Sequence, residues 1–153
     1  MSALPEWLAT ARLKIELVPA SSWGDNLRSL LPKSEWDRLR RDCYARAGHR
    51  CEVCEGVGTK HPVECHEIWQ YDEIDCVQTL TGLVALCPSC HRCKHPGQAQ
   101  SIGLGHLVVP HLRKVNGWTE HQAQTALAFA FMQWEARSSL KWTVNVNWIK
   151  ESR

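Results

Sequence analysis

The residues best suited to chemistry include two pairs of cysteines with the same spacing, Cys-x-x-Cys. Cys51 pairs with Cys54, and Cys87 pairs with Cys90. Zn²⁺ in structural sites takes four tetrahedral ligands, and two thiolates separated by two residues can bind it from one tight turn. Buried free thiols, the competing interpretation, do not explain two matched spacings. We therefore predict a structural zinc ion held by all four cysteines.

A second group of reactive side chains lies in the apolar stretch VECHEIW, where Glu64, Cys65, His66 and Glu67 follow one another. Each can bind a metal or move a proton, and each costs free energy to bury without a partner. On a regular strand Glu64 and His66 share one face, while Cys65 points away. The stretch is a candidate catalytic centre, a candidate metal site, or a polar edge of the core.

Two further histidines, His91 and His95, follow the second cysteine pair. Their spacing of four residues places both imidazoles on one face of a helix, from which they can bind a single metal ion. An exposed polar helix face is the competing interpretation. Because His66 belongs to the same zinc-bound unit, we favour a site to which all three histidines contribute.

The chain between the cysteine pairs must position these residues, and its pattern predicts a strand, a loop, a second strand and a helix. We expect the strands at residues 63–69 and 82–86, joined by a polar loop. Pro88 suits the first turn of a short helix, which Pro96 ends. Residues 97–105 are expected to form a loop.

A helix with basic outer faces is expected before the first cysteine pair. Ser34 can cap its first turn, and Gly48 is a natural stop. Its expected apolar face consists of Trp36, Leu39, Cys43 and Ala47. Basic side chains that could contact nucleic-acid phosphates are Arg38, Arg41 and Arg46, together with Lys94 after the second cysteine pair. A solvated helix face explains the same arginines equally well.

Further elements are expected on either side of this unit. Alternating residues predict one strand over 12–17 and another over 142–148, and we expect the second to pair with the first near Ile15. A long helix begins at the capping box formed by Thr119 and Gln122. Its expected core face consists of Ala123, Leu127, Phe131 and Trp134.

Length and composition fit one globular domain: the chain has 153 residues, of which 44% are hydrophobic and 22% charged. A formal net charge of +2 decides nothing about nucleic acid, so any attraction must come from a local patch. No stretch approaches the roughly 20 apolar residues that cross a membrane. Residues 1–14 lack the pattern of a signal peptide. We therefore expect a cytoplasmic protein whose cysteines are thiols and metal ligands.

The motifs CEVC, VECHEIW and GLVALCPSCHRCKH together resemble the HNH nucleases, whose ββα-metal core often carries two Cys-x-x-Cys zinc knuckles. The resemblance covers about residues 34–97 and leaves a helix and strand extension at about 106–150 outside it. It implies an α+β fold within a single domain, residues 1–153. In that fold a small ββα-metal core held by a Cys₄ zinc is flanked by helices and by an extra pair of N- and C-terminal strands.

The resemblance also implies roles for the histidines. His66 matches the family's first His, the general base that activates water. His91 matches the last conserved His, a ligand of the catalytic metal, and His95 falls where some members have a further ligand.

Two positions depart from the family pattern. Cys65 stands where a metal-binding Asp or His is common, and a thiolate favours a softer ion than Mg²⁺. Glu64 and Glu67 are the nearest carboxylates that could replace it as a ligand. Gly82 stands where an Asn orients the base, so His66 must be oriented by another partner, such as a backbone carbonyl or Thr81.

The resemblance implies a metal-dependent endonuclease that hydrolyses DNA phosphodiester bonds, with His66 as the base. It would need a structural Zn²⁺ and a catalytic divalent ion, namely Mg²⁺, Mn²⁺, Ni²⁺ or Zn²⁺. DNA is the expected partner, and the C-terminal helix could instead dock on a second copy or on another protein. Two alternatives stay open. One is a catalytically inactive zinc-bound HNH-like module that binds nucleic acid or a protein partner. The other is a zinc enzyme of another class, which uses His66 with Glu64 or Glu67 on a small substrate.

Overall fold

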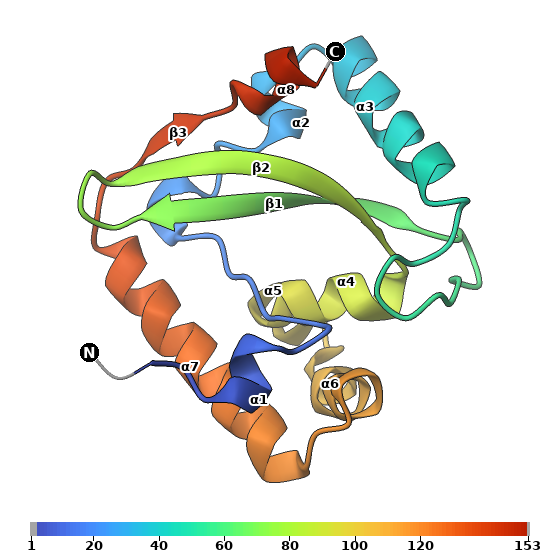
Figure 1. Cartoon of the computed structure of the whole chain (residues 1–153), viewed down its shortest axis with the longest axis vertical. Coiled ribbons are helices and arrows are strands. Elements are labelled where there is room, and N and C mark those ends of the chain that lie inside the picture. Colours follow the sequence, from blue (N-terminus) through green and yellow to red (C-terminus); the bar gives the residue numbers. More distant parts are fainter. Residues whose placement is uncertain (1–2, 153) are drawn as a thin grey trace.

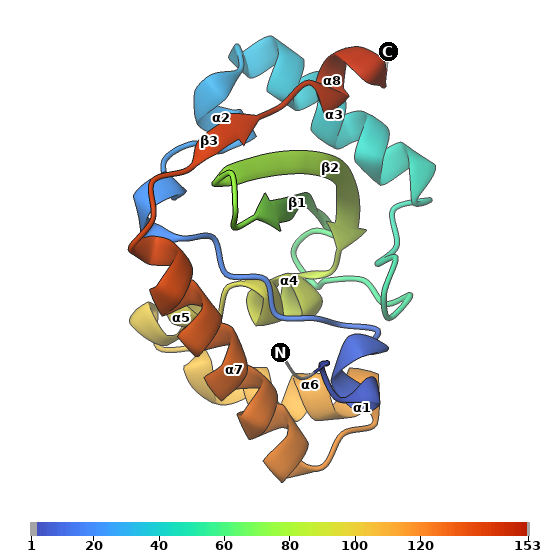
Figure 2. The same ribbon diagram turned by 60° about the vertical axis from the view of Figure 1, so that its left-hand side comes forward.

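The computed structural model describes residues 3–152 and shows an α+β protein in which helices surround a small sheet (Figure 1). Within that range the sheet has three strands, in the order β1-β2-β3. β1 (Glu64–Asp72) and β2 (Val77–Leu86) form an antiparallel hairpin, and β3 (Thr143–Asn145) lies parallel to β2. The hairpin crosses the middle of the molecule and separates two groups of helices (Figure 2).

The principal helices are α3 on one side of the hairpin and four helices on the other. Their bounds are Lys33–Arg46 for α3, Pro88–Lys94 for α4, Pro96–Ser101 for α5, Val108–Asn116 for α6 and Glu120–Ser138 for α7. Short helices connect or end these elements: α1 (Glu6–Ala9), η1 (Ala20–Ser22), α2 (Leu27–Leu30), η2 (Gly105–Leu107) and α8 (Trp148–Glu151). None of the described helices is long and apolar enough to cross a membrane.

The hairpin confirms the two expected strands but is longer than the sequence pattern predicts. The polar loop is confined to a reversal between Asp72 and Val77. This reversal is tight because the Asp72 carboxylate accepts the backbone N–H groups of Ile74 and Asp75, at 2.9 and 3.0 Å. Cross-strand hydrogen bonds then extend both strands through polar residues that periodicity alone assigns to a loop.

α3 has the expected buried face, with Trp36, Leu39 and Cys43 in the core, and Gly48 follows its end with a positive φ of 63°. The cap is different from the one expected. Pro32 occupies the N-cap position and the helix begins at Lys33, so Ser34 already lies within the first turn and caps nothing.

The helices after β2 differ from the prediction in one place. Pro88 occupies the first turn of α4, as expected. Pro96 ends that helix and also begins α5, so the segment expected as a loop at 97–105 is partly helical. A proline can do both, because it lacks the N–H of a helix interior but has the backbone angle of a first turn.

α7 begins at the expected capping box, in which Thr119 and Gln122 exchange side-chain and backbone hydrogen bonds. Its buried face is narrower than predicted and consists of Ala123, Ala126 and Ala130. The expected core residue Phe131 is 37% exposed. Small alanines let the helix pack closely, which leaves the larger side chains at the edges of the contact.

The expected pairing of N- and C-terminal strands is wrong. Residues 12–17 form an extended segment without a strand partner, and β3 pairs with β2 instead. The segment lies between the hairpin and α7 (Figures 1 and 2). Its ends are held by side chains: Asn116 exchanges two hydrogen bonds of 2.9 Å with the backbone of Leu13, and the Trp134 indole donates to the Val18 carbonyl. These bonds satisfy backbone groups that a sheet would otherwise pair.

Candidate metal centres

The four predicted zinc ligands come together at one end of the hairpin. Cys51 and Cys54 lie in the turn after α3, while Cys87 follows β2 as the N-cap of α4 and Cys90 lies in the first turn of that helix. Their sulfur atoms lie within 4.8 Å of one another, and 3.6 Å separates Sγ of Cys54 from Sγ of Cys87. Four thiols at such distances suit a tetrahedral zinc ion.

Backbone amides point at the sulfur atoms of this cysteine centre. The amide of Cys54 donates to Sγ of Cys51, that of Gly56 to Sγ of Cys54, and that of Cys90 to Sγ of Cys87, at 3.4–3.5 Å. Such donors stabilise negative sulfur, so the turns favour thiolates before any ion binds.

The pKa values of the same thiols show how crowded the centre is. The neighbouring Cys90 thiol lowers the pKa of Cys51 to about 4, whereas contact with Cys51 raises the pKa of Cys90. Burial raises the pKa of Cys87 to about 11. One thiolate therefore prevents its neighbours from ionising, and a divalent cation would remove that repulsion.

His111 is a contact of the cysteine centre that the sequence pattern does not reveal. Its Nε2 lies 3.1 Å from Sγ of Cys90 and comes from α6, outside the unit that holds the cysteines. An imidazole N–H at this position would donate a hydrogen bond to the Cys90 thiolate without binding the metal ion itself. Spacing along the chain carries no signal for such a contact, because it depends on how α6 packs against α4.

Three histidines form a second cluster, which shares the helix α4 with the cysteine centre. His66 extends from β1, and His91 and His95 extend from α4 and its end. One ring nitrogen of each lies within 4.8 Å of the others, and the ring centroids are 5.0–5.3 Å apart. The three histidines that the sequence grouped together therefore lie close together in the structure. His95 is the residue between α4 and α5, which lets its ring turn back toward the other two.

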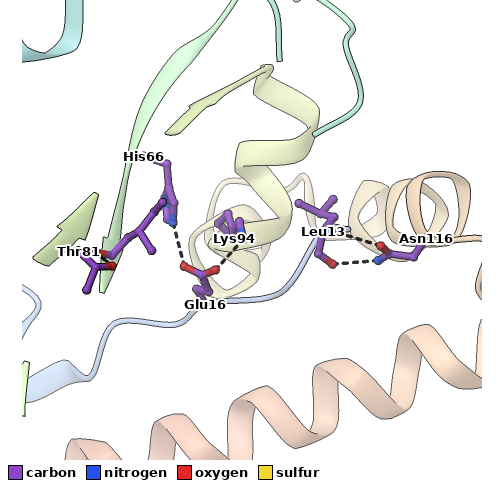
Figure 3. A network of polar contacts seen from close by, with 7 residues as sticks. Leu13, Glu16, His66, Thr81, Lys94 and Asn116 are labelled. Carbon is purple, nitrogen blue, oxygen red and sulfur yellow. Dashed lines mark hydrogen bonds and ion pairs between the residues drawn. The ribbon is translucent and has the colours of Figure 1, made fainter. Parts of the chain in front are cut away.

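Two carboxylates lie beside ring nitrogens of this histidine cluster, and Figure 3 shows one of them, Glu16, next to His66. Oε2 of Glu16 lies 3.4 Å from Nε2 of His66, and Oε2 of Glu64 lies 3.3 Å from Nδ1 of His91. The other oxygen of Glu16 accepts a hydrogen bond of 2.9 Å from Lys94, whose ammonium is almost fully buried. Metal-binding histidines commonly have such carboxylate partners, which fix the tautomer and orient the ring.

The charges of this network follow from burial and pairing. Burial opposes ionisation of Glu16, yet its bonds to His66 and the charge of Lys94 lower its pKa to about 2. Burial lowers the pKa of His66, and burial together with neighbouring positive groups lowers the pKa of His95 to about 3. His66 and His95 are therefore neutral at neutral pH and have lone pairs for a metal ion or a proton.

Glu16 is a functional candidate that sequence reasoning missed. The alternation of residues 12–17 places it on the polar face of an expected half-buried strand, with no reason to single it out. In the structure the segment passes over the histidine cluster, so the same side chain points inward. Its position depends on the two bonds between Asn116 and Leu13 (Figure 3).

Other residues of the VECHEIW stretch face away from the histidines. Cys65 lies on the opposite face of β1, where contact with Cys43 of α3 and burial raise the pKa of its thiol. The Glu67 carboxylate accepts the backbone N–H of Leu27 at 2.9 Å. Among the described residues, the groups close enough to share an ion with His66 are His91 and His95, and do not include Cys65 or Glu64. Glu64 instead supports His91.

Thr81, one of the two partners considered for orienting His66, is bonded elsewhere. Its hydroxyl donates to the backbone carbonyl of Ile68, and His66 is held by Glu16 instead (Figure 3). Gly82 pairs with Ile68 in the hairpin and has no side chain to offer His66.

The four residues predicted to contact phosphates differ in their exposure and in their bonding partners. Arg38 is exposed and pairs with Asp42, while Arg41 is exposed on the same helix. Arg46 already binds the carboxylate of Glu52 and the backbone carbonyl of Leu83. Lys94 is turned into the protein toward Glu16, so it belongs to the histidine cluster and not to an exposed basic surface.

A cleft gives access to the histidine cluster. It has a volume of about 260 Å³, and its wall includes His66, His91 and His95. A second cavity, of about 330 Å³, lies beside Glu16 and also reaches His66. The inner side of the histidine cluster is thus buried, while its other side remains open to small molecules or to part of a larger substrate.

Comparisons with known proteins do not extend this description. No protein-family model matches the chain, and neither the curated proteins nor the solved structures contain a match. The resemblance to the HNH nucleases therefore rests on the residue pattern alone.

Proposed function

We propose that this protein is a metal-dependent endonuclease of the HNH type, which hydrolyses phosphodiester bonds of DNA. The observation that carries the proposal is the convergence of three imidazoles, two of them hydrogen-bonded by carboxylates, beside a cleft. The hairpin and the helix that follows it supply all three, and the cysteine centre fixes the point where the hairpin enters the helix.

The donor set fits a divalent transition metal. Imidazole nitrogens bind Zn²⁺, Ni²⁺ and Mn²⁺ better than they bind Mg²⁺, which prefers oxygen ligands. His91 and His95 would hold the ion, with Glu64 orienting His91. When bound, the metal would neutralise charge on the phosphate and on the departing oxygen.

His66 would serve as the general base. Glu16 beside Nε2 favours the tautomer with the proton on that nitrogen, which leaves the lone pair on Nδ1 free to accept a proton from water. Glu16 also stabilises the imidazolium that forms, and Lys94 keeps Glu16 ionised. Glu16 would thus replace the Asn of the family pattern, whose position Gly82 occupies, and no ligand at Cys65 is needed.

Plasmid cleavage tests the proposal. Purified protein carrying one zinc per chain is incubated with supercoiled DNA while Mg²⁺, Mn²⁺, Ni²⁺ and Zn²⁺ are titrated separately. We expect nicking that depends on the metal and that falls by about 100-fold or more in His66→Ala, the usual cost of losing a general base. His121→Ala, which removes an exposed histidine on α7, is the matched control. Equal nicking by His66→Ala and the wild type would contradict the proposal.

Metal analysis separates the two roles open to His66. If His66 is the base, His66→Ala still binds the second metal ion, whereas His91→Ala and His95→Ala do not. If His66→Ala also loses the second ion, His66 is a ligand and the assignment as base is wrong. Zinc in the cysteine centre serves as the internal standard, because none of these substitutions removes a thiolate.

A catalytically inactive zinc-bound module is the competing function. The buried ammonium of Lys94 favours it, because a positive charge beside His66 and His95 opposes binding of a cation there. DNA binding without any metal-dependent nicking, with only one metal ion per chain, would support the inactive module and exclude the nuclease.

A further inference from the structure

The cleft beside the histidine cluster contains an exposed aromatic ring. Trp23 lines the cleft and is 66% exposed. It is the one exposed residue among the eight tryptophans, all of which lie in the described part of the chain. An indole left open to solvent beside a candidate active site offers a flat apolar surface on which a planar ring can stack.

The same cleft contains a buried polar group without a partner. Gln78 is fully buried in β2, and its Oε1 accepts a hydrogen bond of 2.6 Å from the Ser22 hydroxyl. Its Nε2 is the single buried side-chain nitrogen or oxygen without a hydrogen-bond partner among residues 3–152. Turning the amide over would only exchange which of its two atoms lacks a partner, because Ser22 reaches one of them.

An unpaired buried amide costs free energy and calls for an explanation in a folded protein. Gln78 contributes to the wall of the cleft together with Trp23 and His66, but its amide is covered, so an incoming group supplies the missing acceptor only when neighbouring side chains move aside. The remaining wall is mixed: Val18, Trp36 and Trp69 are apolar, Asp25 and Glu67 are acidic, and Arg28 and Gln98 are polar and exposed. The cleft therefore combines a stacking surface, a hydrogen-bond donor and a cation.

We propose that this cleft binds one unstacked nucleobase next to the phosphate that is cleaved, so the preferred substrate is single-stranded or locally unpaired nucleic acid. The base stacks on Trp23, and the Gln78 amide donates to a carbonyl oxygen or ring nitrogen on its edge. Arg28 contacts a neighbouring phosphate. This assignment of a substrate class rests on the proposed nuclease function.

The size and shape of the cleft agree with this occupant. A volume of about 260 Å³ is below the usual range for drug-sized ligands, roughly 300–1,000 Å³, and suits a single planar group. Bases inside a duplex hide their faces and pairing edges, so stacking and edge contacts require an unpaired base. Contacts with an intact duplex would leave both Trp23 and the Gln78 amide unused.

Binding without cleavage tests the inference separately from the nuclease proposal. Fluorescence anisotropy is measured with the zinc-bound protein and no second metal, on three labelled probes: a thymidine 12-mer, the same strand with a central run of abasic sites, and a 12-bp duplex. We expect the thymidine strand to bind most tightly, and removal of the bases to weaken binding about five-fold or more, the usual contribution of one stacked base. Equal affinity for the abasic and base-containing strands overturns the inference.

Two variants locate the effect. Trp23→Ala should bring the affinity ratio between the base-containing and abasic strands close to one, and Gln78→Met should reduce that ratio. Ile74→Ala, at the 94% exposed tip of the hairpin, is the control and should keep the wild-type ratio. A wild-type ratio in Trp23→Ala overturns the inference. Base-dependent binding without metal-dependent nicking supports the inference and contradicts only the nuclease proposal.

Discussion

Replacing Asn116 by alanine should destabilise the protein although Asn116 lies far from both metal centres in sequence and touches neither. Its side chain accepts the Leu13 N–H and donates to the Leu13 carbonyl, both at 2.9 Å. Leu13 is fully buried, so water cannot replace both bonds. A buried backbone group left without a partner costs about 1–3 kcal/mol.

The expected loss of unfolding free energy in Asn116→Ala is about 2–4 kcal/mol, because Asn116 itself is half-buried and some solvent can reach the site. For a chain of this size, each kcal/mol lowers the melting temperature by roughly 2–4 °C. Asn116→Asp keeps the acceptor for the Leu13 N–H but loses the donor, so it should cost about half as much. Lys114→Ala, exposed on the same helix, should change stability by less than about 0.5 kcal/mol.

Urea unfolding with saturating zinc provides the measurement, and amide hydrogen exchange at Leu13 provides its local counterpart. The Leu13 amide should exchange much faster in Asn116→Ala than in the wild type, with little change in Asn116→Asp. Because the same bonds fix the segment that carries Glu16, nicking by Asn116→Ala should also slow. Wild-type stability together with unchanged exchange at Leu13 would refute the proposed role of this contact.

Three further outcomes follow from the described contacts. Glu16→Gln should lower the free energy of unfolding by about 2–3 kcal/mol, because it leaves the buried Lys94 ammonium unpaired, and Lys94→Met should lower it by about 1–2 kcal/mol, because the Glu16 carboxylate is partly exposed. In urea unfolding, the double variant should recover at least about 1 kcal/mol of the summed loss. Strictly additive losses would contradict the pairing. The pKa of Glu16 is about 2 in the folded state against an ordinary value of 4.5, so the stability that its ionised form contributes is complete above pH 4.5 and is lost as pH falls toward 2. Over that interval the stability difference between wild type and Glu16→Gln should shrink by about 1–2 kcal/mol, after allowance for solvent screening. A stability difference independent of pH would be inconsistent with the lowered pKa. With zinc bound, a thiol reagent should modify Cys76 at the hairpin turn first, and chelation should release four additional thiols, Cys51, Cys54, Cys87 and Cys90; rapid labelling of those four before chelation would argue against the zinc site.

Local patterns in the sequence were sufficient to predict much of the candidate site. Two matched cysteine spacings require two turns that face each other, and His91 and His95 follow the second turn too closely to lie elsewhere. Alternation along VECHEIW correctly separated Glu64 and His66 from Cys65, because a regular strand allows only two directions for side chains. These inferences depend on neighbours in the chain, where geometry is nearly fixed.

Contacts between distant segments were not predictable in the same way. The alternation of residues 12–17 is compatible with a strand, but the side chains of Asn116 and Trp134 hold the backbone that a sheet would otherwise pair. Glu16 therefore seemed a surface residue until the segment was placed over His66. His111 is similar: its contact with Cys90 depends on the packing of α6, which no spacing records.

Proline and alanine account for the remaining differences. Pro96 reads as a stop in the sequence, yet it also starts α5, because the same fixed backbone angle suits both positions. In α7 large apolar residues at helical spacing suggested the buried face, but close packing favoured three alanines and left Phe131 partly exposed.

The helix α4 has only seven residues and serves both centres, with Cys87 and Cys90 at its start and His91 and His95 toward its end. A helix this short is not stable in water without tertiary contacts. If both centres bind ions, occupation of one would therefore raise the population of ordered α4 and, by thermodynamic reciprocity, the affinity of the other centre for its own ion. Whichever ion arrived first, the second would bind to a helix that the first had already ordered.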